Sequence, residues 1–313
     1  MKDISVGICA YNEGSTIGHV IANLLNQALP DDVVLKEIFI VASGCTDTTE
    51  DVVTQISHRN PKVKLMSEKE KRGKASATNL ILGQAGGDII VLTDADVFPA
   101  QGSIRELVKE FRDETVGAVG GRPIPMDDDE TFWGFTSHLI WTHLQNELLK
   151  SEMRQGTFFQ LSGYLCAIRS QLVERIPETV IDEDKYMGEM IRRRGYEVKY
   201  TPRAVVYIRG PRSIPDFFNQ RVRVLVGHLQ VRAWFDLASI STSSPRRILP
   251  ALVRSVDLFN PKKLAWTALA AVLEGFAHLL ARHNFIKGKV AFNWLPVPTT
   301  KPDWDNSPPV CSA

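Results

Sequence analysis

The chain has 313 residues, 44% of them hydrophobic, and a formal net charge of +1. This length and composition exclude a chain too short or too polar to bury its own core, and they suit one large domain or two small ones. The charge is uneven, because residues 1–200 hold 22 Lys and Arg against 30 Asp and Glu, whereas residues 201–290 hold 14 against 4. The later segment is therefore either a solvated basic face or a surface that meets lipid head groups or phosphates.

The cysteines and the first residues bear on the compartment. Cys9, Cys45, Cys166 and Cys311 show none of the paired spacings of zinc or redox motifs, which favours a reducing compartment. The segment Met1–Val6 lacks the long apolar core of a signal peptide, so we expect the N-terminus to stay in the cytosol.

A pattern of strand, loop and helix opens the chain. Strands are predicted at 4–10, 33–41, 63–66 and 88–92, and helices follow the first three near 17–25, 52–56 and 73–82. Strands that alternate with helices require a parallel sheet with right-handed crossovers. The first strand is not followed by Gly-x-Gly-x-x-Gly, and the chain contains no Gly-x-x-x-x-Gly-Lys-Ser/Thr, so neither a dinucleotide fingerprint nor a Walker loop is supported.

Two carboxylates follow the fourth strand. Asp94 and Asp96 lie two residues apart, just past the apolar run 89–92, at the end of the strand where open α/β sheets bind their ligands. If the strand geometry persists, both side chains point the same way and can share one divalent cation and the diphosphate that it carries. The alternative is that one of them caps the helix whose pattern begins near Gly102.

Four loops fall at this same edge of the predicted sheet. They are Ala10-Tyr11-Asn12-Glu13, Ser43-Gly44-Cys45-Thr46-Asp47, Arg72-Gly73-Lys74 and Thr93-Asp94-Ala95-Asp96. In this order they resemble the loops of the glycosyltransferase family 2 enzymes. The resemblance implies a nucleotide-sugar-binding α/β domain of the GT-A type, with a mostly parallel sheet flanked by helices.

The resemblance also implies a donor site. The first two loops would hold the nucleoside, through Ala10, Tyr11, Asn12, Glu13 and Ser43. Asp94 would lie near the ribose, and Asp96, with Asp94 beside it, would bind the metal that bridges the diphosphate. An oxygen-rich site of this kind suits Mg²⁺ or Mn²⁺ rather than zinc. The family usually has acidic residues at the start of the second loop, where this chain has Ala42 and Ser43, so the base is left open.

A basic cluster, residues 71–74, opens the third predicted helix. Cations at this position oppose the helix dipole, which costs a few tenths of a kcal/mol each. Their placement is better explained by a nearby diphosphate, and the resemblance assigns Gly73 and Lys74 to the donor site. A solvated surface is the alternative.

The middle of the chain adds one further candidate. Residues 116–121 predict a fifth strand, and the acidic residues 126–130 precede a long helical pattern over 132–153, whose dipole they compensate. Residues 158–169 are strand-like around Gly163, which often signals a close approach of the backbone to a ligand. The segment is similar to the one that lines the donor sugar in the family, and a bulge in a buried strand is the alternative.

A second carboxylate cluster, residues 182–184, precedes a helix over 186–194 and a strand at 198–200 that is predicted to end in Pro202. Glu183 and Asp184 match the acidic pair of the family. Attack of a sugar hydroxyl at the anomeric carbon with inversion needs a carboxylate that takes the proton, and we assign Asp184 as this base, with Glu183 as its catalytic neighbour. Asp182 is an ambiguity of register, and helix capping is the rival role for all three.

The segment 215–228 resembles the Gln-x-x-Arg-Trp helix of membrane-associated and processive family members. Gln220 and Arg223 match and are assigned to the donor site, where Arg223 would contact the diphosphate. Val224 stands in the place of the tryptophan that positions the acceptor, which argues against a processive polymerase.

Two later segments, 246–254 and 264–281, are candidates for membrane contact. The second is at the lower edge of a spanning length. Because Glu274 would be costly to bury in lipid, a helix lying in the membrane interface is favoured over a spanning helix. Packing on the core of the protein itself is the alternative.

These observations predict a catalytic domain at 1–212, a basic helical extension at 213–290 and a Pro-rich tail at 291–313. The predicted reaction is the metal-assisted, inverting transfer of a sugar from a nucleoside diphosphate to a hydroxyl or a polyprenyl-type lipid phosphate, at the cytoplasmic face of the cell membrane. We expect the nucleotide sugar, the acceptor and an anionic membrane surface as partners, and no nucleic acid. The alternatives are a sugar-phosphate nucleotidyltransferase, which would need a glycine-rich loop after the first strand, and a non-catalytic, nucleotide-sugar-binding membrane scaffold.

Overall fold

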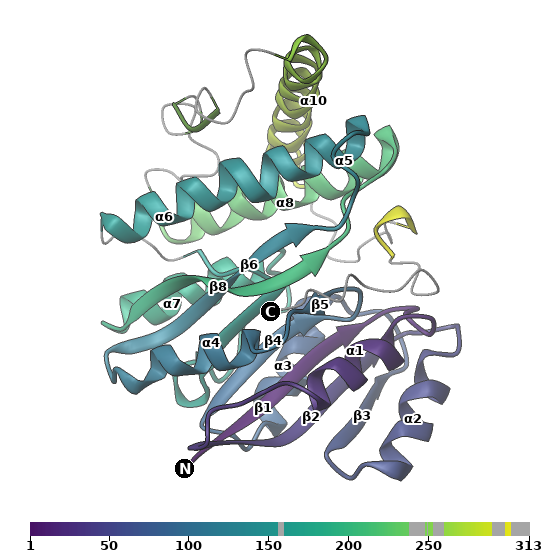
Figure 1. Ribbon diagram of the computed structural model, residues 1–313, viewed down its shortest axis with the longest axis vertical. Coiled ribbons are helices and arrows are strands. Elements are labelled where there is room, and N and C mark those ends of the chain that lie inside the picture. The colour runs from purple at the N-terminus through teal and green to yellow at the C-terminus, as the bar shows by residue number, and fades with distance from the viewer. Residues whose placement is uncertain (156–159, 238–247, 249, 253–259, 290–297, 302–313) are drawn as a thin grey trace.

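The computed structural model describes residues 1–155, 160–237, 248, 250–252, 260–289 and 298–301. In this part of the chain, helices cover both faces of an eight-stranded sheet, and a long helix near the C-terminus stands away from it (Figure 1). The strands are β1 (Lys2–Ala10), β2 (Val33–Ser43), β3 (Val63–Glu68), β4 (Ile89–Asp94), β5 (Phe98–Pro99), β6 (Val116–Pro125), β7 (Leu165–Arg169) and β8 (Glu197–Ile208). The α-helices are α1 (Ile17–Leu25), α2 (Thr49–Arg59), α3 (Lys74–Gln84), α4 (Ser103–Lys109), α5 (Phe132–Ser137), α6 (Asn146–Arg154), α7 (Glu183–Arg193), α8 (Ile214–Trp234) and α10 (Pro261–Ile286). Short 3₁₀-helices are η1 (Glu110–Arg112), η3 (Ser170–Leu172) and η5 (Pro298–Thr300), and η2 (His138–Gln145) is a π-helix.

The strand order is β3-β2-β1-β4-β7-β6-β8-β5, and β1 to β4 run parallel, which confirms the predicted mostly parallel α/β sheet. β7 is antiparallel to both of its neighbours. Cys9 pairs with Asp94 and Ala10 pairs with Ala42, so the loops after β1, β2 and β4 leave the sheet at the same edge. The strand order reverses between β1 and β4, and an open α/β sheet binds ligands at such a point.

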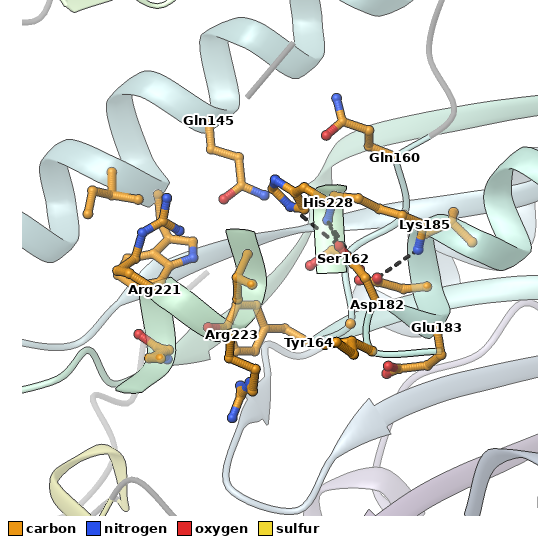
Figure 2. Close-up of a pocket in the computed structure, with 18 of the residues that line it drawn as sticks. Gln145, Gln160, Ser162, Tyr164, Asp182, Glu183, Lys185, Arg221, Arg223 and His228 are labelled. Carbon is orange, nitrogen blue, oxygen red and sulfur yellow. Dashed lines mark hydrogen bonds and ion pairs between the residues drawn. The ribbon is translucent and has the colours of Figure 1, made fainter. Parts of the chain in front are cut away.

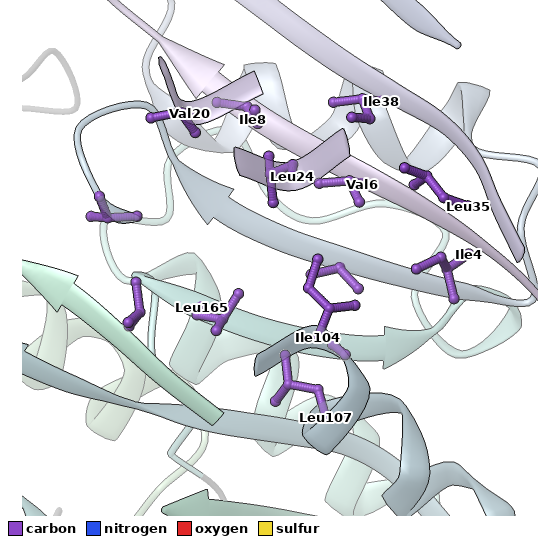
Figure 3. Close-up of a cluster of buried hydrophobic side chains, with 14 of the residues drawn as sticks. Ile4, Val6, Ile8, Val20, Leu24, Leu35, Ile38, Ile104, Leu107 and Leu165 are labelled. Carbon is purple, nitrogen blue, oxygen red and sulfur yellow. The ribbon is translucent and has the colours of Figure 1, made fainter. Parts of the chain in front are cut away.

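Two apolar layers hold the sheet between its helices. On one face, Ile4 and Ile8 of β1 pack with Leu24 of α1 (Figure 3). The other face packs against α3 and α7. A Cβ on Gly7 of β1 would lie 2.5 Å from a side-chain carbon of Ile81, so the glycine lets α3 lie close to the strand.

The prediction that the strand at 198–200 ends at Pro202 is wrong, because β8 continues through the proline to Ile208. The register between β6 and β8 shifts between Gly120 and Arg122, so that β8 holds extra residues there. Proline is accepted at such an irregularity because the residue there donates no ladder hydrogen bond.

The strand predicted over 158–169 is also shorter than expected. β7 begins only at Leu165, and Gly163 lies in the turn before it, where the Leu165 amide donates to the carbonyl of Ser162 at 3.2 Å. Residues 158 and 159 lie outside the described part of the chain. The turn is tied to β4, because the Thr93 hydroxyl donates to the Tyr164 carbonyl at 2.7 Å.

The long helix predicted over 132–153 is present, but its middle is π-helical. α5 and α6 are joined without a break by η2, whose eight residues follow the wider π pattern. A π-helix has more residues per turn than an α-helix, so its side chains point in directions that an α-helix would not give them. Such segments are frequent at functional sites.

The apolar run predicted at 264–281 lies within α10, which packs against α8 and α5. α10 is the one helix in the described residues that is long and apolar enough to cross a membrane, by length and composition alone. One side buries small residues such as Ala277 and Ala281 against α8, while Phe276 and Leu279 remain 56% and 66% exposed. The other candidate for membrane contact, 246–254, lies largely outside the described residues.

α10 is also fixed to α8 by charge. The guanidinium Nε of Arg221 donates to Oε2 of Glu274 at 2.9 Å. Burial alone would raise the pKa of Glu274, but the charge and hydrogen bonds of Arg221 outweigh it and hold this pKa below its ordinary value. The carboxylate that would be costly in lipid is thus paired inside the protein.

Candidate functional site

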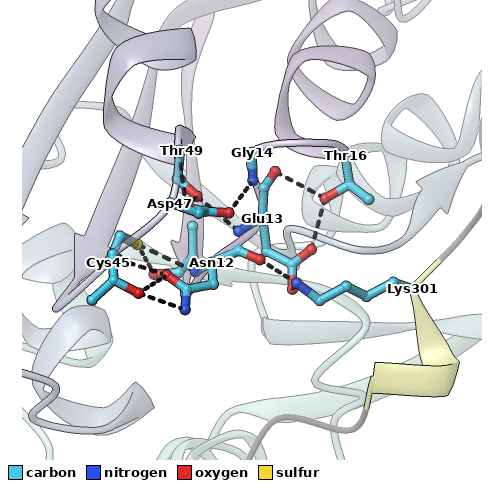
Figure 4. Close-up of polar contacts among 10 residues, drawn as sticks. Asn12, Glu13, Gly14, Thr16, Cys45, Asp47, Thr49 and Lys301 are labelled. Carbon is cyan, nitrogen blue, oxygen red and sulfur yellow. Dashed lines mark hydrogen bonds and ion pairs between the residues drawn. The ribbon is translucent and has the colours of Figure 1, made fainter.

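The loops after β1 and β2 are tied to each other at the carboxyl edge of the sheet (Figure 4). The Thr46 amide donates to Oδ1 of Asn12 at 2.7 Å, which holds Asn12 in a left-handed conformation with φ of 54°. Asp47 accepts from the amides of Gly14 and Thr49, both at 3.0 Å. The sequence forms this pair of loops because short Asn and Asp side chains bond readily to nearby backbone. The two loops therefore form one rigid wall.

A cavity of about 210 Å³ lies beside this wall, and we call it the donor pocket. Of the residues predicted to bind the donor, those that line it are Ala10, Tyr11, Glu13, Ser43, Gly73, Lys74, Asp94, Gln220 and Arg223, and the predicted metal ligand Asp96 joins them. Asn12 braces the loops behind the wall and does not line the pocket, whereas Gly163 lines a neighbouring cavity.

The residues of the basic cluster at the start of α3 make different contacts. Lys74 lies between two carboxylates, 2.7 Å from Asp94 and 2.9 Å from Glu183. The Lys71 ammonium lies 3.7 Å from the centre of the Tyr11 ring, at the wall of the donor pocket. Arg72 instead pairs with Glu178 at 2.8 Å and does not line the pocket, so only part of this cluster meets the site.

Asp96 carries an electrostatic penalty that a cation would relieve. Burial, followed by the charges of Asp94 and Glu13, raises its pKa to about 7. Among the described residues, no group of three or more His, Cys, Asp or Glu side chains is arranged to hold a metal ion. Two carboxylates nevertheless suit Mg²⁺ or Mn²⁺, because Mg²⁺ commonly takes one or two protein carboxylates and completes its shell with water and substrate phosphates. Asp94 and Asp96 thus fit a metal that is bound together with a diphosphate.

A second cavity, also of about 210 Å³, adjoins the donor pocket, and we call it the acceptor pocket (Figure 2). Both cavities are lined by Lys74, Asp94, Tyr164, Gln220 and Arg223. The far wall of the acceptor pocket is apolar and comes from the π segment η2, with Ile140, Trp141 and Leu144. The two cavities are therefore separate compartments with a common wall.

The cluster Asp182-Glu183-Asp184 lies at the start of α7 and lines the acceptor pocket. Asp182 is 3.2 Å from the Lys185 ammonium and 3.4 Å from Nε2 of His228. Oδ1 of Asp184 accepts from the Lys185 amide at 2.7 Å. The N-terminal turn of a helix favours negative charge, so α7 supports an ionised carboxylate here.

These carboxyls differ in protonation. Burial alone would raise the pKa of Asp184, but the charge of Lys185 and a hydrogen bond from Asp182 outweigh it and lower that pKa. Burial and the charge of Asp184 raise the pKa of Asp182 well above its ordinary value. Burial also raises the pKa of Glu183, against the charge of Lys74. The protonated form is therefore favoured at Asp182 and the ionised form at Asp184.

Gly163 lies close against Asp184 and Lys74. A Cβ added at this glycine would lie 3.0 Å from Oδ2 of Asp184 and 3.3 Å from Nζ of Lys74. The turn before β7 therefore lies close to both charged groups, at the wall of the acceptor pocket. The approach of this backbone to a ligand stays a prediction, and the glycine lies in a turn and not within a strand.

Some residues of the two pockets have no signal in the sequence. Thr300 and Lys301 line the donor pocket from η5 and the residue that follows it, nearly 290 residues after the loop they face. Trp141 carries an ordinary apolar helix pattern and still forms part of the acceptor pocket. His228 is buried beside Asp182, and its proximity follows only from the packing of α8 against α7.

Comparison with known proteins supports the family resemblance that the sequence motifs indicate. Residues 5–176 match the family described as glycosyl transferase family 2. A poly-beta-1,6-N-acetyl-D-glucosamine synthase of Staphylococcus aureus strain COL is 27% identical over 235 residues, which are 74% of this chain and 56% of the relative. The corresponding synthase of Staphylococcus epidermidis is 24% identical over the same shares. The chain thus matches little more than half the length of these curated relatives.

Solved structures of glycosyltransferases have a fold similar to that of this chain. A mannosyltransferase from Pyrobaculum calidifontis, in complex with GDP-Man and Mn²⁺, superposes with a TM-score of 0.61 at 27% identity, over 91% of this chain and 79% of that one. A glucosyl-3-phosphoglycerate synthase from Mycobacterium tuberculosis gives a TM-score of 0.52 at 21% identity, over 74% of this chain and 78% of that one, which supports the fold alone.

Proposed function

The chain belongs to glycosyl transferase family 2, and on this premise we propose that it transfers a sugar from a nucleoside diphosphate to an acceptor hydroxyl or lipid phosphate, with inversion at the anomeric carbon. The mannosyltransferase that resembles this chain was solved with a nucleoside-diphosphate sugar and Mn²⁺, which supports both the donor class and the metal. A nucleotidyltransferase finds no support in the family match.

The observation that carries this proposal is the meeting of two compartments at one wall. The donor pocket holds the carboxylates suited to a metal-bound diphosphate, and the acceptor pocket holds the ionised Asp184. Lys74 and Asp94 line both pockets where they meet, and Gly163 lies beside Lys74 and Asp184. A sugar placed there would have its leaving group on one side and an incoming hydroxyl on the other, as inversion requires.

Each residue has a distinct part in the proposed reaction. Asp184 takes the proton of an acceptor hydroxyl, because it is charged at neutral pH and lines the acceptor pocket. Glu183 holds the Lys74 ammonium at 2.9 Å and so aims it at the junction. Lys74 and Arg223 line both pockets and offer positive charge to a departing diphosphate. When bound by Asp96 and Asp94, Mg²⁺ or Mn²⁺ would neutralise that diphosphate further.

The nature of the acceptor is proposed from the pocket and from α10. The apolar wall from η2 suits an acceptor with a hydrocarbon portion, such as a polyprenyl-type lipid. The exposed apolar residues of α10 and the basic segment 201–290 suit an anionic membrane surface at the cytoplasmic face. In this proposal, 1–212 is the catalytic domain and 213–290 is the extension that meets the membrane.

Calorimetry with a panel of nucleoside diphosphates and their sugars tests the donor site directly. We expect binding of one base class in the presence of Mn²⁺, loss of that binding with a chelator, and loss in Asp96→Ala. Product analysis with the donor that binds then tests transfer. Absence of binding by the folded protein across the panel would refute the donor site, and binding without transfer to sugar or lipid acceptors would support a scaffold role instead.

A further inference from the structure

A short segment near the C-terminus lies against the mouth of the donor pocket. Residues 298–301, which we call the strap, comprise η5 and Lys301, and Figure 1 shows η5 in yellow beside the carboxyl edge of the sheet. Thr300 is 8% exposed, and both it and Lys301 line the donor pocket. The pocket wall is thus completed by residues far from the catalytic sequence motifs.

The strap is anchored to the start of α8. The Thr299 hydroxyl donates to Oδ2 of Asp216 at 2.6 Å and accepts from the Arg212 amide at 3.1 Å. α8 also carries Gln220 and Arg223, which line the same pocket. The anchor therefore fixes the strap relative to known residues of the pocket wall.

The last residue of the strap places a cation on the loop after β1. The Lys301 ammonium lies 3.3 Å from Oε1 of Glu13 and donates to the Asn12 carbonyl (Figure 4). Its side chain is 29% exposed, so it is accessible from the pocket that it lines. Glu13 faces the same pocket, and without Lys301 its carboxylate would repel an anionic donor.

We propose that Lys301 is a donor-binding residue, held by the Thr299 anchor, whose ammonium neutralises Glu13 and attracts the diphosphate of the nucleotide sugar. This inference rests on the proposed function, because it takes the ligand of this pocket to be a nucleoside diphosphate. Lys74 is already shared between Asp94 and Glu183. Lys301 supplies a further positive charge in this pocket, on the loop after β1 that is proposed to hold the nucleoside.

The test is calorimetry of the full chain with Mn²⁺ and the nucleoside diphosphate that binds the wild type. In Lys301→Gln the dissociation constant is expected to rise roughly tenfold to a hundredfold, the range of one hydrogen bond to a charged group. Binding of the uncharged nucleoside is expected to change far less. Lys301→Arg should retain most of the affinity, and Thr299→Val should show a smaller loss in the same direction.

Lys287→Ala is the matched control, since it removes an exposed lysine at the C-terminal end of α10. Thermal unfolding of each variant checks that the fold is kept. Equal affinity of Lys301→Gln and the wild type would overturn the inference while leaving the donor site intact. Tighter binding would also overturn it and show that the strap obstructs the pocket. If neither the wild type nor Lys287→Ala binds any nucleoside diphosphate, the proposed function itself fails.

Discussion

Three adjacent carboxyls at the start of α7 show how position alone separates their chemistry. Asp182 is enclosed by Lys185 and His228 and has a raised pKa, whereas the pKa of Asp184 is lowered. Burial and the charge of Lys185 also lower the pKa of His228 well below its ordinary value, so its ring is neutral. Among the three, Asp184 is the carboxyl whose pKa is lowered and which lies against Gly163.

Replacing Asp184 by Asn is therefore expected to remove the base while preserving volume. Transfer to a hydroxyl acceptor should fall by roughly 10²–10⁴-fold, the usual contribution of general base catalysis. Donor binding, measured by calorimetry, should remain close to that of the wild type. Asp182→Asn is the comparison, because the raised pKa of Asp182 favours the protonated form, which an amide mimics, and its loss of activity should be smaller. Full transfer activity in Asp184→Asn would refute the assignment of the base.

Gly163→Ala tests the position of the two charged groups beside this glycine. The added methyl would crowd Asp184 and Lys74, with contacts of 3.0 and 3.3 Å to their side-chain ends. We expect kcat/KM for transfer to drop by roughly 10²-fold, as a small misplacement of reacting groups does, while the free energy of unfolding changes by less than about 1 kcal/mol. Gly83→Ala is the control, since its Cβ would meet nothing within 4 Å. Unchanged kinetics in Gly163→Ala would show that the sugar lies elsewhere.

The sequence could identify the residues whose chemistry is local. Asp94 and Asp96 follow a strongly apolar strand, and the strand end alone places them at a ligand-binding edge. Lys301 could not be found in this way, because its partners, Glu13 and Asn12, are brought to it by tertiary structure. The division of roles among residues 182–184 was also hidden, since it depends on Lys185 and His228.

The pairing of α8 with α10 depends on an ion pair at its centre. Arg221 holds the pKa of Glu274 below its ordinary value, so the carboxylate is charged in the folded protein across the neutral range. A lowered folded pKa stabilises the protein at pH values above the unfolded pKa, and this stabilisation is lost as the pH falls through the folded pKa. The contact between the two helices should therefore weaken in acid.

Chemical unfolding of the wild type and Glu274→Gln from pH 7 to pH 3 measures this effect. Near pH 7 the variant is expected to be less stable by on the order of 2 kcal/mol, a typical value for hydrogen bonds to a charged group. The difference should shrink as the pH falls below about 4.5, the ordinary pKa of Glu. His278 lies 3.6 Å from Glu274 and is present in both proteins, so its titration largely cancels in the comparison. A difference that does not depend on pH would mean that packing, and not charge, holds α10.

Helices and strands were predictable where the apolar residues of a segment follow a single spacing. The apolar run at 89–92 and the spacing of Val20 and Leu24 gave β4 and α1 directly. The π geometry of η2 was not predictable, because the same apolar spacing fits an α-helix and the extra residue per turn is decided by packing. β8 was cut short in the prediction because Pro202 usually ends a strand, and only its register with β6 reveals the bulge.

Across the whole molecule, the excess of basic residues in the sequence and the exposed apolar side chains of α10 both fall in the last third of the chain. Residues 201–290 hold 14 Lys and Arg against 4 Asp and Glu, and α10 leaves Phe276 and Leu279 more than half exposed. Such a combination favours the surface of an anionic bilayer. For this part of the fold, the sequence left open whether the helix contacts a membrane or packs on the core of the protein. Burial of one side of α10 does not decide what contacts its other side.

Sedimentation with vesicles tests this proposal. We expect the protein to bind vesicles that contain anionic lipid more strongly than neutral ones, and to be released by salt. Leu279→Ser together with Phe276→Ser should reduce binding severalfold without lowering stability, because both side chains are exposed. Leu80→Ser, at an exposed position on α3, is the control. Equal binding by the double variant and the wild type would indicate that α10 does not contact the membrane.

The common wall of the two pockets also constrains how this protein can be redesigned. Lys74, Asp94, Tyr164, Gln220 and Arg223 face both compartments, so in the proposed reaction a substitution there would alter the choice of both substrates at once. Ser43 faces only the donor side and Trp141 only the acceptor side. Selectivity for one substrate is therefore best tuned from these outer positions, while changes in the shared wall would have to be optimised for both substrates together.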